Sequence, residues 1–300
     1  METEILDKYK KAGQIAAEAL QYGKSLIKKG ASVLDVTQKI TAKIEELGGK
    51  LAFPVNISLN DTAAHYSAKI NDELKLNDEI IKLDVGAHVD GYIGDTACTI
   101  DLSGKNADLV KASEDALQAA IKIIKPGVTL GQIGKAIEDT ITKAGFKPVR
   151  NLSGHGLGEY RSHAEPQIPN FDTGDDTKLE KGQIIAIEPF ATNGIGLIQD
   201  KGVAEIFSMM GFKSVRVTFV RNVMKYIGDT FLTLPFSKLQ LSKKFSEGQI
   251  SFALKQFSQL GIMHEYKPLV EARNGLVSQA EHTIYVDDTP IILTKLEKTN

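Results

Sequence analysis

Apolar residues recur at helical spacing in two stretches of the chain, residues 6–46 and 109–144. Each stretch contains a glycine turn, a hydroxyl residue suited to capping a helix, apolar positions three or four residues apart, and a closing glycine. Seven positions match at one offset of 97 residues: Gly30, Ser32, Val33, Val36, Ile40, Ile44 and Gly48 with Gly127, Thr129, Leu130, Ile133, Ile137, Ile141 and Gly145. The chain therefore contains a duplicated unit, and a further helix is predicted before the capped helix of each copy.

Strand-like sequence follows each copy. After the first, the β-branched run 79–102 is interrupted at Asp90-Gly91, which predicts a hairpin. After the second, a glycine-rich segment at 153–163 precedes a strand over 183–190, and the last strands are expected over 278–286 and 290–294. We predict an α+β fold in which two related halves share an antiparallel sheet with pseudo-twofold symmetry.

The pattern changes again between residues 203 and 263, where the sequence is mildly basic and has helical spacing. We interpret this segment as a helical insertion. The duplicated domain is then formed by residues 1–202 and 264–300, and the insertion by 203–263.

Composition restricts the class of protein. With 300 residues, 42% hydrophobic and 25% charged, the chain has the composition of a soluble globular protein. The net charge of −2 creates no global field toward DNA or an anionic membrane, and no stretch approaches the roughly 20 apolar residues that span a bilayer. The single cysteine, Cys98, excludes an intramolecular disulfide and is expected in the core. Because the N-terminal sequence has no targeting pattern, we expect a cytoplasmic protein.

Four carboxylates occupy strands that otherwise look buried. Asp84 and Asp95 lie in the two strands of the hairpin, where like charges facing one another repel, and Glu188 and Glu281 lie in the later apolar strands. An unpaired buried charge costs several kcal/mol, and these strands carry too few lysines and arginines to pair with them. A pair of divalent metal ions, with an imidazole from His155 between two glycines, would cancel the charge. Such a site favours Mn, Co, Zn or Fe and would support metal-assisted hydrolysis.

The other histidines fall into two groups. His65 and His163 stand near the predicted site in polar or glycine-rich segments, whereas His88, His264 and His282 are interpreted as structural or exposed. The sequence has neither the nucleophile elbow of serine hydrolases nor a Walker-type phosphate loop.

At these residues the sequence resembles a known family. Five residues in chain order resemble the metal ligands of the methionine aminopeptidases and of their pita-bread relatives, the prolidases and creatinases: Asp84, Asp95, His155, Glu188 and Glu281. The segments LNDTAAHYSA, HGLGEYRSHAEPQIPNF and AEHTI are similar to type II methionine aminopeptidases in particular. The separation of 93 positions between the last two ligands fits the type II insertion, and without a long N-terminal extension the chain is similar to the short archaeal form. The resemblance implies a duplicated pita-bread fold.

The resemblance also implies the cofactors and their ligands. Two divalent ions, of Co, Mn, Zn, Fe or Ni, would be bridged by Asp95 and Glu281. Asp84 would complete one metal site, and His155 with Glu188 the other.

Further roles are implied for residues around the metals. His65 and His163 would contact the substrate and stabilise the tetrahedral intermediate, while Glu188 would shuttle a proton. Phe53, Phe190 and Tyr266 match positions that line the pocket for the methionine side chain. Pro189, directly after Glu188, differs from many eukaryotic members.

The implied activity is removal of the initiator methionine from nascent chains when the second residue is small, by attack of metal-activated hydroxide on the first peptide bond. The substrates would be N-terminal methionyl peptides, and we expect a monomer that binds neither DNA nor membranes. Ribosome association is compatible with this activity, although no residue in the sequence supports it.

Two alternatives remain open at this stage. One is a prolidase-like or Xaa-Pro aminopeptidase on the same fold. The other is a non-catalytic pita-bread protein that binds protein or RNA, supported only by basic residues of the insertion: Lys213, Arg216, Arg221, Lys225, Lys243 and Lys244.

Overall fold

A computed structural model of the chain describes residues 2–296. Two helix pairs repeat along it: α1 (Thr3–Leu26), α2 (Val33–Glu46), α3 (Ala107–Ile123) and α4 (Leu130–Lys143). Ser32 accepts a hydrogen bond from the Asp35 backbone N–H, and Thr129 accepts one from Gln132, so both predicted caps are confirmed. The glycines at both ends of each repeat have positive φ: Gly30, Gly48, Gly127 and Gly145. The two copies therefore share their local backbone geometry as well as their apolar pattern.

The predicted hairpin is confirmed in the first half of the molecule. Strands β4 (Ile80–Val89) and β5 (Tyr92–Asp101) pair antiparallel over their whole length. Asp90 and Gly91 form the turn with φ of 51° and 89°, values that match the right-handed twist of the strands. On its other side β4 pairs with β1 (Lys50–Leu51) and β2 (Asn56–Leu59).

The second half contains a five-stranded sheet in the order β18-β17-β9-β7-β8 and a three-stranded sheet in the order β16-β10-β6. The strands are β6 (Lys147–Pro148), β7 (Ser153–Gly158), β8 (Arg161–Pro169), β9 (Ile184–Ile187), β10 (Phe190–Thr192), β16 (Val277–Gln279), β17 (His282–Tyr285) and β18 (Ile291–Ile292). A third sheet, β11-β15-β3, joins β3 (Thr62–Ala64), β11 (Ile198–Asp200) and β15 (Leu269–Glu271).

The prediction of continuous strands over 183–190 and 278–286 is wrong. Each is broken, β9 from β10 at Glu188-Pro189 and β16 from β17 at Ala280-Glu281. The two breaks lie side by side, because His282 pairs with Ile187 and Phe190 pairs with Gln279. Pro189 has no N–H to donate to a neighbouring strand, which accounts for the break between β9 and β10. Beyond the two breaks, both strands pass from the five-stranded sheet into the three-stranded sheet.

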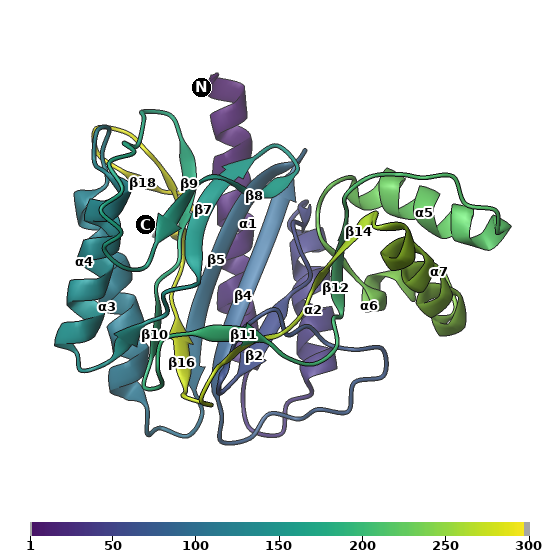
Figure 1. The fold of residues 1–300 in the computed structure, drawn as a ribbon, viewed down its shortest axis with the longest axis horizontal. Helices are drawn as coiled ribbons and strands as arrows, with labels where there is room; N and C mark the ends of the chain where they lie inside the picture. The colour runs from purple at the N-terminus through teal and green to yellow at the C-terminus, as the bar shows by residue number, and fades with distance from the viewer. Residues whose placement is uncertain (1, 297–300) are drawn as a thin grey trace.

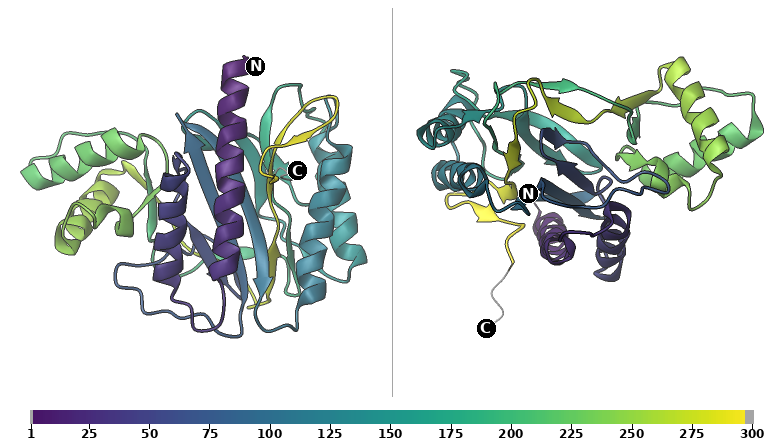
Figure 2. Two further views of the ribbon diagram at one scale, coloured as in Figure 1. Left: turned by 180° about the vertical axis from the view of Figure 1, so that it is seen from behind. Right: turned by 90° about the horizontal axis from the view of Figure 1, so that it is seen from below.

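Helices α1 to α4 cover one face of the strands (Figures 1 and 2). Apolar residues of α1 and α2 form one hydrophobic cluster with β2 and β4, which includes Ile40, Ile57 and Leu83. Those of α3 and α4 form another with β9, which includes Ile137 and Ile185. The opposite face of the strands is thereby left for the polar residues of the site.

The segment predicted as a helical insertion projects to one side of the molecule (Figure 2) and contains strands as well as helices. Its elements are β12 (Ile206–Met209), α5 (Thr218–Phe231), β13 (Phe236–Ser237), α6 (Lys238–Leu241) and α7 (Glu247–Leu260). Strand β14 (Met263–Tyr266) pairs with β12 and so continues past residue 263. The helices pack on a separate hydrophobic cluster that includes Val223, Phe236 and Phe257. The boundaries drawn from the sequence stay a prediction.

Among residues 2–296, no helix combines the length and apolar character that crossing a membrane requires.

Candidate metal centre

A cavity of about 230 Å³ is lined by residues from both halves of the duplicated domain and from the insertion. The ten residues predicted for the site all line it: Phe53, His65, Asp84, Asp95, His155, His163, Glu188, Phe190, Tyr266 and Glu281. Their positions along the chain differ by as much as 228 residues, from Phe53 to Glu281. Folding therefore brings these ten residues to one cavity.

The two aspartates are diagonal neighbours in the hairpin, and the expectation that they face one another is wrong. Asp84 pairs with Ala97, and Asp95 pairs with Gly86. Side chains two residues apart point to the same face of a strand, so both carboxylates still enter the cavity. The diagonal arrangement separates the two charges more than a direct pair would, which reduces their repulsion.

Both glutamates lie at the strand breaks described above. Glu188 follows β9 directly, and Glu281 immediately precedes β17. Both glutamates therefore reach the cavity from positions next to a strand break.

His155 reaches the carboxylates from β7. Its Nε2 lies 3.5 Å from Glu188 Oε1 and 4.0 Å from Asp95 Oδ2. A side chain at either neighbouring glycine would overlap backbone, Gly154 with the Ala186 carbonyl and Gly156 with the Glu165 carbonyl. The prediction that flanking glycines permit close backbone approach here is confirmed. Ligand atoms of Asp95, His155 and Glu281 all lie within 4.8 Å of one another, a spacing that could hold a metal ion.

Threonine hydroxyls join the two halves beside these ligands. Thr283 Oγ1 accepts from the Asp95 N–H and donates to the Asp95 carbonyl, each at 2.8 Å. Thr96 Oγ1 donates to the Glu281 carbonyl at 2.9 Å, and the Glu281 N–H donates to the Ala97 carbonyl. The backbones of Asp95 and Glu281 are thus held against each other by short polar links, which determines the spacing of their carboxylates.

The carboxylates are electrostatically unsatisfied by the described protein groups. Burial raises the pKa of Asp84, and burial together with neighbouring carboxylates raises the pKa of Asp95, Glu188 and Glu281. Asp84 Oδ1 and Asp95 Oδ1 have no hydrogen-bond partner within residues 2–296. Burial, followed by the nearby His163, lowers the pKa of His155 to about 3, which leaves a neutral imidazole free to ligate. This donor set of oxygens and one neutral nitrogen fits divalent metal ions.

Sequence reasoning missed Gln279. Its amide Nε2 lies 3.5 Å from carboxylate oxygens of Asp84, Glu188 and Glu281, and its side chain is fully buried. The uncharged amide of Gln279 therefore places one N–H₂ donor group near three carboxylates. The available signal was its position two residues before Glu281, which places it toward the same face of the chain.

His65 and His163 also line the cavity. His65 has a positive φ of 65°, and its ring packs edge-on against Tyr266 with centroids 5.5 Å apart. His163 is exposed on β8 and lies 4.4 Å from the His155 ring, centroid to centroid. Burial, followed by His163, lowers the pKa of His65 to about 4. His65 is therefore a neutral hydrogen-bonding group at pH 7.

Comparison with known proteins assigns the chain to a family. The sequence model of metallopeptidase family M24 matches residues 7–218. The chain belongs to this family. The methionine aminopeptidase of Archaeoglobus fulgidus is 43% identical to this M24 chain over 295 residues, which cover 98% of the chain and 99% of that protein. The resemblance to methionine aminopeptidases that the motifs indicated is thereby confirmed.

Solved structures agree with the fold of this M24 chain. The methionine aminopeptidase of Thermotoga maritima superposes with a TM-score of 0.72 at 25% identity and covers 98% of both chains. The prolidase of Pyrococcus furiosus superposes with a TM-score of 0.61 at 19% identity, covers 99% of this chain and 65% of its own, and supports the fold alone. The predicted α+β pita-bread class is confirmed.

Proposed function

We propose that the protein is a dinuclear metal-dependent methionyl aminopeptidase that removes the initiator methionine from nascent proteins when the second residue is small. The observation that carries the proposal is the convergence of four carboxylates and a neutral imidazole in one cavity, where Asp95 and Glu281 are buried and Asp84 and Glu188 are half-buried. Full-length similarity to a protein named methionine aminopeptidase supports the substrate. The type II form is part of the proposal.

Five residues would hold the two divalent ions. Asp95 and Glu281 would bridge both, Asp84 would complete one site, and His155 with Glu188 the other. The unpartnered oxygens of Asp84 and Asp95 support this arrangement. Bound divalent ions supply a Lewis acid and lower the pKa of water, so that hydroxide is available near neutral pH. The proposal keeps Co, Mn, Zn, Fe and Ni as candidates.

The other polar residues would act on the substrate directly. Glu188 would hold the proton that the attacking water loses and deliver it to the leaving amine. His65 and His163 would donate hydrogen bonds to the scissile carbonyl oxygen as it gains negative charge. One such donor is typically worth about 10²–10³ in rate.

Specificity would come from the aromatic wall of the cavity. Phe190 is fully buried, while Phe53 packs over Gly86, where a side chain would overlap its ring. With Tyr266 these rings form an apolar surface suited to the flexible methionine thioether. The cavity is small, so a bulky second residue would be excluded by its size.

The proposal also covers the oligomeric state, the cellular location and the domain boundaries of the protein. We expect a monomer in the cytoplasm acting on nascent chains, with ribosome association as a prediction that no described residue supports. The catalytic domain would be residues 1–202 and 264–300, and the insertion 203–263.

The experiment is peptide cleavage by the purified protein with added Mn²⁺ or Co²⁺. We expect Met-Ala-Ser to be cleaved, Met-Leu-Ser to be cleaved much more slowly, and Glu281→Ala to abolish activity because a bridging ligand is lost. Glu265→Ala is a matched control, because Glu265 is exposed on β14 and lies outside the cavity lining.

Two results would contradict the proposal. Cleavage of Xaa-Pro peptides in preference to Met-Ala-Ser would indicate a prolidase-like enzyme. Full activity of Glu281→Ala would remove the metal assignment.

A further inference from the structure

Strand β14 is the last strand of the insertion's sheet, which has the order β13-β12-β14. One edge of β14 pairs with β12, and the other has no strand beside it among residues 2–296. Tyr266, at the end of β14, lines the cavity that contains Asp95 and Glu281, which we call the metal cavity. His264 and Glu265 are exposed. An unpaired strand edge thus leads from the surface of the molecule to the wall of the metal cavity.

The hydrogen bonds of the sheet determine which backbone groups face the free edge of β14. The Met210 N–H donates to the Ile262 carbonyl at 2.8 Å, one position beyond the β12–β14 ladder. Hydrogen-bonded and non-hydrogen-bonded pairs alternate in an antiparallel ladder. The even-numbered residues of β14 therefore bond to β12, whereas Met263 and Glu265 direct their N–H and C=O groups away from it. Neither residue makes another backbone hydrogen bond within residues 2–296.

The opposite edge of β12 gives the same assignment independently. The Lys238 N–H donates to the Glu205 carbonyl at 3.3 Å, at the end of the β12–β13 ladder. By the same alternation, the odd-numbered residues of β12 bond to β13, and the even-numbered ones bond to β14. Even-numbered residues of β12 pair with even-numbered residues of β14. The odd-numbered residues of β14 are again the ones that face the free edge.

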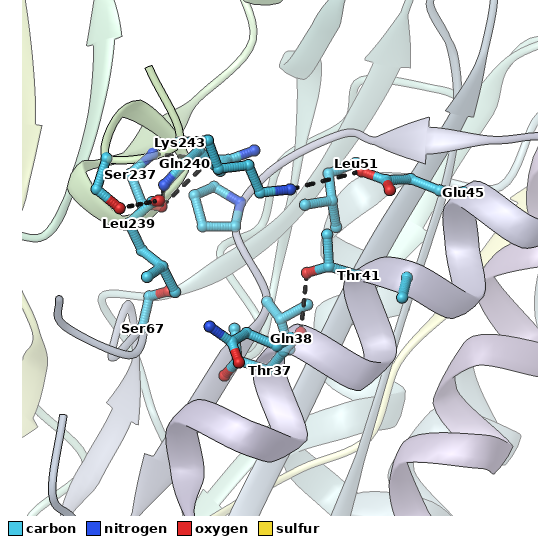
Figure 3. A pocket seen from close by; sticks show the side chains of 14 residues that line it. Thr37, Gln38, Thr41, Glu45, Leu51, Ser67, Ser237, Leu239, Gln240 and Lys243 are labelled. Carbon is cyan, nitrogen blue, oxygen red and sulfur yellow. Dashed lines mark hydrogen bonds and ion pairs between the residues drawn. The ribbon is translucent and has the colours of Figure 1, made fainter. Parts of the chain in front are cut away.

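A peptide chain bound by its N-terminus must continue outside the metal cavity. The volume of about 230 Å³ is below the roughly 300–1,000 Å³ of sites that enclose a whole small ligand. A second cavity, of about 270 Å³, lies between α2 and α6, where Figure 3 shows Glu45 facing Lys243. None of the residues that line it lines the metal cavity, so the two are separate spaces. The second cavity is therefore not the way out.

Two edge strands approach each other at the Tyr266 side of the metal cavity. Strand β8 is the last strand of the five-stranded sheet and carries His163, which is exposed. The His163 and Tyr266 rings are stacked with centroids 6.4 Å apart, and the His264 ring lies 4.5 Å from that of Tyr266. A chain that leaves the metal cavity on this side passes directly beside the free edge of β14.

We propose that the free edge of β14 binds the extended backbone of the substrate beyond its first three residues, as an added antiparallel strand. Strand β14 runs from Met263 toward the cavity at Tyr266, whereas a chain whose N-terminus lies in the cavity runs outward, so the two directions are opposite. Backbone pairing does not depend on side chains. It therefore suits substrates that share only their first residues. This inference rests on the proposed aminopeptidase activity.

The first test compares two amidated peptides, Met-Ala-Ser and Met-Ala-Ser-Gly-Ala-Ser, with the wild-type protein and Mn²⁺. We expect kcat/KM to be about 10-fold higher for the hexapeptide, because backbone hydrogen bonds to β14 are added. Methylation of one backbone nitrogen, at the fourth, fifth or sixth residue, should remove the gain at alternate positions only. The reason is that successive N–H groups of a strand point to opposite sides.

A proline substitution tests the same edge from the side of the protein. Glu265→Pro removes an N–H that faces the free edge, and proline is tolerated where the N–H of an edge strand faces solvent. It should lower kcat/KM for the hexapeptide about 2- to 10-fold and leave that for Met-Ala-Ser unchanged, because the tripeptide ends before the edge. Glu265→Ala keeps the N–H and is the matched control for the loss of the side chain.

A binding measurement separates this inference from the proposed activity. A hexapeptide in which a methyleneamine replaces the first peptide bond cannot be cleaved. It should slow hydrogen exchange at the Met263 and Glu265 amides, whereas the corresponding tripeptide should not.

Three results would each overturn the proposal: no protection of these two amides, equal kcat/KM for the two peptide lengths, or an equal effect of methylation at all three positions. Failure to cleave Met-Ala-Ser would instead contradict the proposed function, and hydrogen exchange would still decide whether the edge binds a peptide.

Discussion

Buried carboxylates occur in this protein in two different settings, which their hydrogen bonds distinguish. Glu271 is fully buried and accepts hydrogen bonds from the backbone N–H groups of Ile195, Gly196, Arg273 and Gly275. Its charge is satisfied without a cation, and it connects the loops on either side. Asp84 and Asp95, by contrast, each keep an oxygen without a partner in residues 2–296. The first setting stabilises the fold, and the second is suited to binding cations.

Replacing Glu271 with glutamine should destabilise the protein in a pH-dependent way. Burial alone would raise the pKa of Glu271, but hydrogen bonds from Gly275, Arg273, Ile195 and Gly196 together lower it below 4.5. A lowered pKa means that the carboxylate contributes stability above pH 4.5 and loses it as the pH falls through the folded-state value. At pH 7 we expect Glu271→Gln to cost about 2–4 kcal/mol of unfolding free energy.

Urea unfolding at pH 7 and pH 4 measures this effect. The difference between Glu271→Gln and wild type should narrow at the lower pH. Glu46→Gln, at an exposed position on α2, should change stability little at either pH. A difference that is the same at both pH values would show that the charge of Glu271 does not contribute.

At the scale of secondary structure, the two repeats differ at their helix caps. Thr129 and Gln132 form a reciprocal capping box at the start of α4, in which each side chain accepts from the backbone N–H of the other. Ser32 accepts from the Asp35 N–H at the start of α2, but among the described residues the Asp35 side chain accepts no hydrogen bond from the Ser32 N–H. The second copy therefore has two satisfied N–H groups where the first has one.

The substitution Thr129→Ala should consequently cost more stability than Ser32→Ala. We expect about 1–2 kcal/mol for the first and about 0.5–1 kcal/mol for the second, because the former also releases the Gln132 side chain. Thermal or urea unfolding of the single variants measures the order, with Thr142→Ala at an exposed site near the end of α4 as control. An equal or larger cost for Ser32→Ala would contradict the interpretation of the capping box.

At the scale of the whole molecule, residues from both halves and from the insertion line the cavity that contains the candidate metal ligands. Asp84 and Asp95 come from the hairpin of the first half, whereas His155, Glu188 and Glu281 come from the second. Tyr266 comes from the sheet that also carries the insertion. A cation bound there would link both halves in the native state and would find no such site in the unfolded chain.

Addition of Mn²⁺ should therefore raise the unfolding temperature. At a free concentration of 100 times the dissociation constant, binding to the native state contributes about 2.7 kcal/mol. For a protein of this size that corresponds to a rise of about 5 °C in a thermal scan. Chelation with EDTA should reverse the shift, and Glu281→Ala should reduce it strongly. An equal shift in Glu281→Ala would place the bound ion elsewhere.

Local sequence patterns accounted for the helix repeats, both caps, the hairpin and its turn, because each depends on neighbours a few residues apart. The ten site residues were also predicted, but through motifs that resemble a known family. The strand breaks at Glu188 and Glu281 were not predicted, although Pro189 at the first break was a local signal against a continuous strand. The sheet in the insertion was likewise not predicted.

By itself, then, the sequence determined the four helices of the repeat and the hairpin, and it supplied the candidate residues of the site. Only the tertiary structure decided that Asp84 and Asp95 are diagonal, that Gln279 donates among three carboxylates, and that α2 and α6 enclose a second cavity. These features depend on contacts between residues up to 198 positions apart, such as Glu45 and Lys243. No local pattern records such contacts, because they exist only once the two halves and the insertion have packed together.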